Sequence, residues 1–149
     1  MGSELRVFLD TSALFAAVSS ELGGARLVLK LGEAGAVSLW VGPWVLREAE
    51  AVLARKSPRS KGRFALLLDR ARVRVGQEAS ARALKEALSV VEYLPDAQVV
   101  AEALTIGVDY FVSFDRKHLV GRQSMKGLPF AVGTAGDFLG WYREKLSPA

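Results

Sequence analysis

The sequence predicts an α/β domain with three layers, helix, sheet and helix, built on a mainly parallel sheet of about five strands. Short runs of β-branched and aromatic residues alternate with longer segments of helical apolar spacing along the 149 residues. This alternation is typical of parallel sheets, whose strands are buried on both faces and joined by crossover helices. No repeat or linker-like segment interrupts the pattern, so we expect one domain over residues 1–149.

The individual elements follow from apolar runs and from apolar spacing. Strands are expected at 5–9, 37–41, 73–75, 110–113 and 130–132. Helices are expected at 25–34, 43–53, 64–70, 79–91 and 96–106, with a last one after Thr134 or Gly136 that ends near Leu146. Pro43 suits a first helical position, because a missing N–H costs nothing there. Asp10 is expected to open one more helix directly after the first strand.

The composition excludes several classes of protein. Without cysteine there is no disulfide framework, cysteine zinc site, iron–sulfur cluster or thiol nucleophile, and one histidine excludes any site that needs two from one chain. The most apolar stretch, 39–46, is far shorter than the ~20 residues that span a bilayer. Asp10 interrupts the apolar start before it reaches the length of a signal-peptide core. We therefore expect a cytoplasmic protein without a membrane segment.

Positive charge is concentrated in one segment. The net charge is +4 and the isoelectric point is near 9.6, which allows an anionic partner without requiring one. The segment 55–63 contains no acidic residue and has five basic ones: Arg55, Lys56, Arg59, Lys61 and Arg63. It is either a solvated loop that promotes solubility or an arm that contacts phosphates, and the composition does not separate these interpretations.

Acidic residues occur where strands end and helices begin. Asp10 follows the first expected strand and Asp115 follows the strand at 110–113, so parallel strands would bring both to the same edge of the sheet. Asp96 opens an apolar helix, and Glu48 lies at the border of the apolar stripe of the helix at 43–53. Taken singly, the two aspartates at helix starts are expected to be N-caps, Glu48 a surface residue, and Glu102 merely exposed.

Taken together, the four acids indicate a metal site. Four carboxylates in one crevice repel one another strongly, and a hard divalent cation is the expected compensation. Oxygen ligands select Mg²⁺ or Mn²⁺ over zinc. Pairs of such ions are common in enzymes that displace phosphodiesters in line.

The acids lie in segments that resemble, in order, the motifs of the PIN-domain family, which includes the VapC-type toxin ribonucleases. The segments are 7–14, 45–53, 95–104 and 107–119, followed by 134–139, which resembles the family's ending. The resemblance places metal-site acids at Asp10, Glu48, Asp96 and Asp115 and puts Ser113 at the usual Thr/Ser position. The sequence departs from the pattern in three places: His118 stands where many relatives have Asp, Ala135 replaces a Pro, and Pro43 and Trp44 make the second segment bulkier than in most relatives.

The resemblance implies a Mg²⁺- or Mn²⁺-dependent endoribonuclease, a candidate for the toxin of a toxin–antitoxin pair. Asp10, Asp96 and Asp115 would hold the metal, and Glu48 would complete the site or orient the attacking water. Three hydroxyls would either support these acids or cap helices: Thr11, Ser12 and Ser113. The implied partners are RNA, a second copy of the chain in a homodimer, and an antitoxin-like protein over the acidic crevice.

Seven basic residues are candidates for contacts with the RNA backbone: Arg55, Lys56, Arg59, Lys61, Arg63, Arg116 and Lys117. His118 is expected to be partly exposed and to contact phosphate or nothing, in preference to acting as a general base. Its departure from the family pattern supports an alternative function. In that alternative the chain is a catalytically decayed PIN module that serves as an RNA- or protein-binding scaffold.

Overall fold

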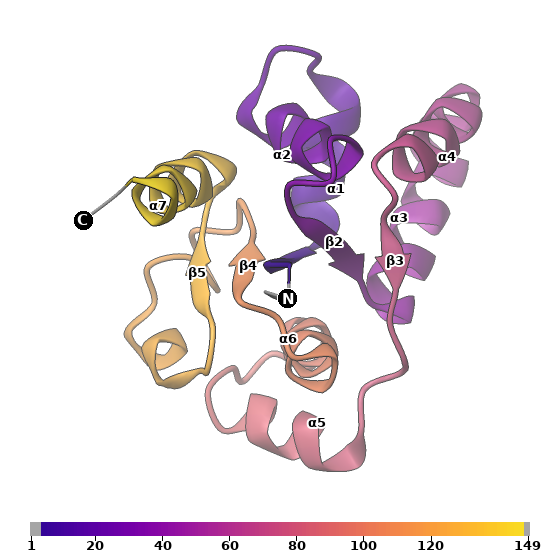
Figure 1. Ribbon diagram of the computed structural model, residues 1–149. Helices are drawn as coiled ribbons and strands as arrows, with labels where there is room; N and C mark the ends of the chain where they lie inside the picture. Colours follow the sequence, from indigo (N-terminus) through magenta and orange to yellow (C-terminus); the bar gives the residue numbers. More distant parts are fainter. Residues whose placement is uncertain (1–3, 148–149) are drawn as a thin grey trace.

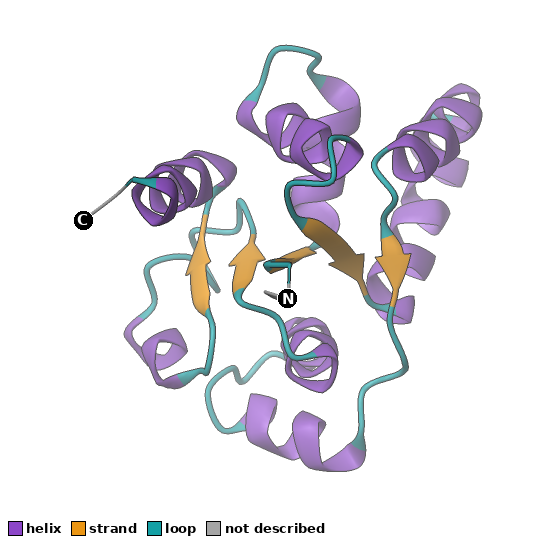
Figure 2. Ribbon diagram, viewed as in Figure 1, coloured by secondary structure: helices purple, strands orange, loops and turns teal. Residues whose placement is uncertain are grey.

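A computed structural model describes residues 4–147 of the protein. Its strands are β1 (Arg6–Leu9), β2 (Ser38–Val41), β3 (Arg74–Val75), β4 (Tyr110–Val112) and β5 (Ala131–Gly133). They form one sheet in the order β3-β2-β1-β4-β5, and every neighbouring pair is parallel. The predicted fold class is confirmed (Figures 1 and 2). The expected domain, 1–149, includes the terminal residues 1–3 and 148–149, which lie outside the described residues.

Helices cover both faces of the sheet. They are α1 (Thr11–Ser19), α2 (Gly24–Glu33), α3 (Pro43–Lys56), α4 (Lys61–Arg70), α5 (Ala81–Leu88), α6 (Leu94–Ile106) and α7 (Ala135–Leu146), with short 3-10 helices η1 (Pro58–Ser60) and η2 (Gln123–Gly127). Figure 1 shows α1, α2, α4 and α7 on one side of the sheet and α5 and α6 on the other. In residues 4–147 no single helix is long and apolar enough to cross a membrane. Only α1 and α2 taken together have the length and composition of such a helix, and the two are bent by 94° relative to each other.

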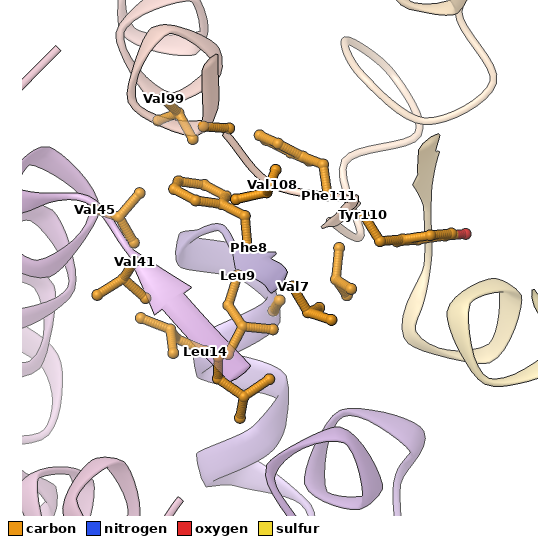
Figure 3. Close-up of a cluster of buried hydrophobic side chains, with 14 of the residues drawn as sticks. Val7, Phe8, Leu9, Leu14, Val41, Val45, Val99, Val108, Tyr110 and Phe111 are labelled. Atoms are coloured by element: carbon orange, nitrogen blue, oxygen red, sulfur yellow. The ribbon is translucent and has the colours of Figure 1, made fainter. Parts of the chain in front are cut away.

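The core is centred on β1, the middle strand. Its residues Val7, Phe8 and Leu9 are almost completely buried, and the Phe8 ring stacks on Phe111 of β4 with centroids 5.0 Å apart (Figure 3). The parallel register pairs Leu9 with Val112, and the backbone N–H of Asp10 continues the ladder to the carbonyl of Val112. Burial of β1 therefore fixes where Asp10 leaves the sheet.

Two local predictions are wrong. The basic segment 55–63 is not a loop, because α3 continues to Lys56, η1 follows, and α4 begins at Lys61. Asp96 is not a helix N-cap: α6 begins at Leu94 after the N-cap Tyr93, and Asp96 lies in the first turn. Pro95 explains the earlier start, because proline is tolerated in the first turn of a helix and sets a helical φ there.

Candidate metal centre

The carboxyl edge of the sheet brings the four predicted acids together. Asp10 follows β1 and Asp115 follows β4, while α3 supplies Glu48 and α6 supplies Asp96. The charge of Asp115 acts on both Asp10 and Asp96, and the charge of Glu48 acts on Asp96. Ligand atoms of Asp96, Asp115 and His118 lie within 4.8 Å of one another.

Asp10 is both a helix cap and a buried member of this cluster. Its Oδ1 accepts hydrogen bonds from the backbone N–H of Ala13 (2.9 Å) and from Ser12 Oγ (2.7 Å), which confirms the predicted N-cap of α1. Only 5% of the residue is exposed. Burial raises the pKa of Asp10, the charge of Asp115 raises it further, and hydrogen bonds from Ser113, Ser12 and Ala13 oppose the increase.

Asp96 has an oxygen without a partner. Its Oδ2 is buried and accepts no hydrogen bond from any residue in the described part of the chain. The pKa of Asp96 is raised, first by burial and then by the charge of Asp115, while the nearby His118 opposes the increase. A buried carboxylate oxygen without a donor is costly, and neighbouring negative charge increases that cost. The arrangement fits a hard divalent cation, for which carboxylate oxygens are the preferred ligands.

Three hydroxyls hold the acids in place. Thr11 Oγ1 donates to Glu48 Oε1 at 2.6 Å, which links the start of α1 to the exposed carboxylate on α3. Ser12 Oγ accepts from the backbone N–H of Phe114 at 2.9 Å, and Ser113 Oγ accepts from that of Asp115 at 3.0 Å. The last two bonds shape the turn after β4. All three hydroxyls therefore contact a predicted acid or the backbone beside one.

His118 lies inside the acidic cluster. Its Nδ1 is 3.2 Å from Asp115 Oδ2 and 3.9 Å from Asp96 Oδ2, and its side chain is 45% exposed. Its backbone N–H also donates to Asp115 Oδ1 at 2.9 Å. The expected partial exposure is confirmed. The expectation that it contacts phosphate or nothing missed these two carboxylates, which sequence spacing alone does not bring to one place.

The seven predicted phosphate-contacting residues are all exposed. Arg63 pairs with Glu21 on the loop after α1, with an N–O distance of 2.8 Å. Within residues 4–147 the other six have no carboxylate within 4.0 Å. Arg116 and Lys117 follow Asp115 directly in the chain. The exposed positive charge is thus available to an anionic partner.

Glu102 was predicted to be exposed, and that prediction is wrong. The residue is 2% exposed, and its carboxylate accepts the backbone N–H groups of Trp44 (2.6 Å) and Val45 (3.3 Å) at the start of α3. Burial raises the pKa of Glu102, and these two N–H groups oppose the increase. The available signal was that Glu102 is the only charged residue between positions 97 and 106, a helical stretch whose other residues are mostly apolar, as is typical of a buried helix.

Comparisons with known proteins show which solved structures have a similar fold. No family model and no curated protein matches the sequence. Two solved structures are similar: VapC20 of Mycobacterium tuberculosis, described as a toxin that cleaves the sarcin-ricin loop, and PAE2754 of Pyrobaculum aerophilum. VapC20 is 23% identical, with a TM-score of 0.53, over 74% of this chain and 91% of its own. PAE2754 is 15% identical, with a TM-score of 0.58, over 94% of this chain and 90% of its own. The expected PIN-like, VapC-type fold is thereby confirmed.

Proposed function

We propose that the protein is a metal-dependent endoribonuclease that hydrolyses RNA phosphodiester bonds. The observation that carries the proposal is the buried Asp96 Oδ2, which accepts no hydrogen bond within residues 4–147 and lies beside the Asp115 carboxylate at the open edge of the sheet. The likeness of the fold to that of VapC20, described as a toxin that cleaves the sarcin-ricin loop, supports it. A metal cation would stabilise an oxygen in that position, to which the only basic nitrogen within 4.0 Å among residues 4–147 is His118 Nδ1, at 3.9 Å.

The proposed metal ligands are Asp10, Asp96 and Asp115, with Glu48 completing the set, and the proposed ion is Mg²⁺ or Mn²⁺. When bound, such an ion lowers the pKa of the attacking water and offsets negative charge on the phosphate. Thr11 orients Glu48 through its 2.6 Å hydrogen bond. Ser12 and Ser113 keep the turn that carries Asp115 in place. The proposed products are a 5′-phosphate and a 3′-hydroxyl.

The proposed RNA contacts are electrostatic. They involve Arg55, Lys56, Arg59, Lys61, Arg63, Arg116 and Lys117, all exposed. Contacts of this kind give affinity without reading the base sequence, and they weaken with added salt because releasing counterions into a more concentrated solution is less favourable. RNA binding is therefore expected to fall steeply with ionic strength.

The proposed biological setting is a cytoplasmic toxin–antitoxin pair. In it the chain forms a homodimer, and an antitoxin protein covers the acidic crevice. The fold likeness to the toxin VapC20 supports this setting. Co-expression with a neighbouring small reading frame, followed by co-purification, tests for the antitoxin, and sedimentation of the purified chain tests for the dimer.

RNA cleavage assays test the proposed activity. Structured and single-stranded RNA are incubated with the protein in Mg²⁺, Mn²⁺ or EDTA, and cleavage is expected only with a metal ion. Asp10→Asn should abolish it, whereas Asp69→Asn, which removes an exposed acid on α4, should not. Unchanged cleavage by Asp10→Asn eliminates the proposed mechanism.

A second candidate function is a non-catalytic RNA- or protein-binding scaffold. It is favoured by His118, which stands within 3.2 Å of Asp115 in the place of a family acid. It predicts RNA retention that EDTA does not alter and no turnover of any RNA. His118→Asp distinguishes the two cases, because restoring the acid should create cleavage in a decayed site and should not be needed in an active one.

A further inference from the structure

A cavity of about 440 Å³ opens directly beside the acidic cluster. It shares Asp96 and His118 with the cluster, and its other wall includes Tyr93, Arg122 and Ser124. Ligand pockets have volumes of roughly 300–1,000 Å³, so the cavity is large enough for a small organic group. Of the four proposed metal ligands, only Asp96 lines this space.

Tyr93 contributes an exposed aromatic ring to the lining of the cavity. The residue is 59% exposed although it immediately precedes α6, and its hydroxyl has no hydrogen-bond partner among residues 4–147. Its ring is inclined by 27° to the His118 imidazole, with centroids 6.2 Å apart. Both rings line the cavity, and His118 also lies beside the carboxylates of Asp96 and Asp115. Exposed rings of this kind stack on nucleobases, whatever the base sequence.

The polar groups of the cavity match the rest of a nucleotide. Arg122 is exposed and has no carboxylate within 4.0 Å in the described part of the chain, so its guanidinium is available to a phosphate. Ser124 offers a hydroxyl on the same wall. Glu92 also lines the cavity, and a carboxylate accepts hydrogen bonds from an exocyclic amino group of a base.

We propose that this cavity is a nucleobase subsite, in which one unpaired base of an RNA strand stacks on Tyr93 beside the acidic cluster. The identity of the ligand as RNA rests on the proposed function. Stacking needs a free base face, which a continuous duplex does not offer. The subsite is therefore expected to accept an unpaired nucleotide and to exclude a base-paired one.

A fluorescent base reports the stacking directly. A short single-stranded RNA containing one 2-aminopurine is titrated with the protein in Ca²⁺, a hard cation that suits oxygen ligands. The wild type and Tyr93→Phe should quench the fluorescence alike. Tyr93→Ala should lose the quenching and bind roughly 5- to 100-fold more weakly, the range for loss of one aromatic stack. Leu22→Ala, which truncates a side chain that is 95% exposed on another loop, should match the wild type.

Two results overturn the subsite. Equal quenching by Tyr93→Ala and the wild type shows that the base does not stack there. Loss of quenching in Tyr93→Phe as well shows that the hydroxyl, not the ring, makes the contact. Thermal melts of both variants confirm that each is folded before it is compared.

Cleavage with Mn²⁺, measured on single-stranded and duplex forms of the same RNA, separates failure of the subsite from failure of the proposed function. Preferential cleavage of the single strand that Tyr93→Ala abolishes supports both proposals. Equal cleavage of both forms by the wild type and Tyr93→Ala overturns the subsite and leaves the nuclease standing. If no RNA is cleaved but Tyr93-dependent quenching persists, the subsite stands and the nuclease proposal fails.

Discussion

Asp10 has two roles that place opposite demands on its charge. As the N-cap of α1 it accepts a hydrogen bond from Ala13, and this needs only an oxygen. As a member of the acidic cluster it is 5% exposed and faces Asp115, so its negative charge destabilises the metal-free fold. An asparagine keeps the cap oxygen and removes the charge. The two roles are therefore separable by a single substitution.

Asp10→Asn is expected to stabilise the metal-free protein and to remove its response to metal. Relief of about 1 kcal/mol of charge burial raises the melting temperature of a domain of this size by about 2–4 °C. Thermal melts in EDTA and in Mn²⁺ measure both effects. Asp69→Asn is the control, because it removes an exposed charge and should leave both curves unchanged. A lower melting temperature for Asp10→Asn in EDTA would contradict the account.

Thr11→Val is expected to reduce RNA cleavage by about 10- to 100-fold, as loss of a bond that orients a metal ligand usually does. Valine has nearly the shape of threonine but cannot donate to Glu48 Oε1. Thr11→Ser keeps the hydroxyl and should retain most of the activity. Rates at increasing Mn²⁺ show whether the loss lies in metal affinity. Full activity in Thr11→Val would exclude a positioning role.

The position of a site residue could be predicted where a neighbouring strand in the sequence determines it, and could not where packing between distant elements determines it. Asp10 follows β1 directly and Asp115 lies three residues after the end of β4, so strand prediction alone placed both at the same sheet edge. Glu102 and His118 depend on packing between elements, which spacing along one helix or turn does not encode. The structure alone shows that Glu102 reaches α3 and that His118 reaches Asp96.

At the scale of elements, the start of α3 depends on α6. Gly42 precedes α3, and its N-cap position has no side chain to satisfy the first N–H groups of the helix. Glu102 of α6 accepts two of them instead. A Cβ at Gly42 would overlap the Glu102 carboxylate, so only glycine allows this close approach. The bond matters for the site because α3 carries Glu48.

Glu102→Ala is expected to lower the melting temperature by about 4–8 °C, because it leaves buried N–H groups unpaired at a cost of about 2 kcal/mol. Gly42→Ala should have a similar effect by displacing the same carboxylate. Glu50→Ala, which truncates an exposed acid on α3, is the matched control and should change little. Melting curves of the three variants measure these effects. An unchanged melting temperature for Glu102→Ala would show that water replaces the carboxylate.

The order and type of the elements followed from the sequence because apolar periodicity reports burial directly. All five predicted strands and the helices between them occur in the structure. The helix boundaries near 55–63 and 94–96 could not be predicted from the sequence, because charged residues at helix ends carry no periodic signal. Lys56 and Lys61 end one helix and begin the next with their charges in solvent.

At the scale of the whole molecule, buried acids set how stability depends on pH. Burial raises the pKa values of Asp10, Asp96 and Glu102 in the folded protein. The folded state therefore binds more protons than the unfolded chain at pH values between the ordinary and the raised pKa. The stabilisation from these groups is complete below the ordinary values, 3.8 for Asp and 4.5 for Glu, and is lost as the pH rises through the raised ones.

The metal-free protein is consequently expected to melt at a lower temperature at pH 7 than at about pH 5, by a few degrees if the net effect is about 1 kcal/mol. With Mn²⁺ present the slope should reverse, because protonated carboxylates do not bind metal and deprotonated ones do. Melting curves at several pH values, with EDTA and with Mn²⁺, measure both slopes. Asp10→Asn should flatten each of them, since it removes one of the shifted groups and one proposed ligand. If the melting temperature depends on pH in the same way with and without metal, the protein itself satisfies the buried acids. That result would contradict the proposed metal site.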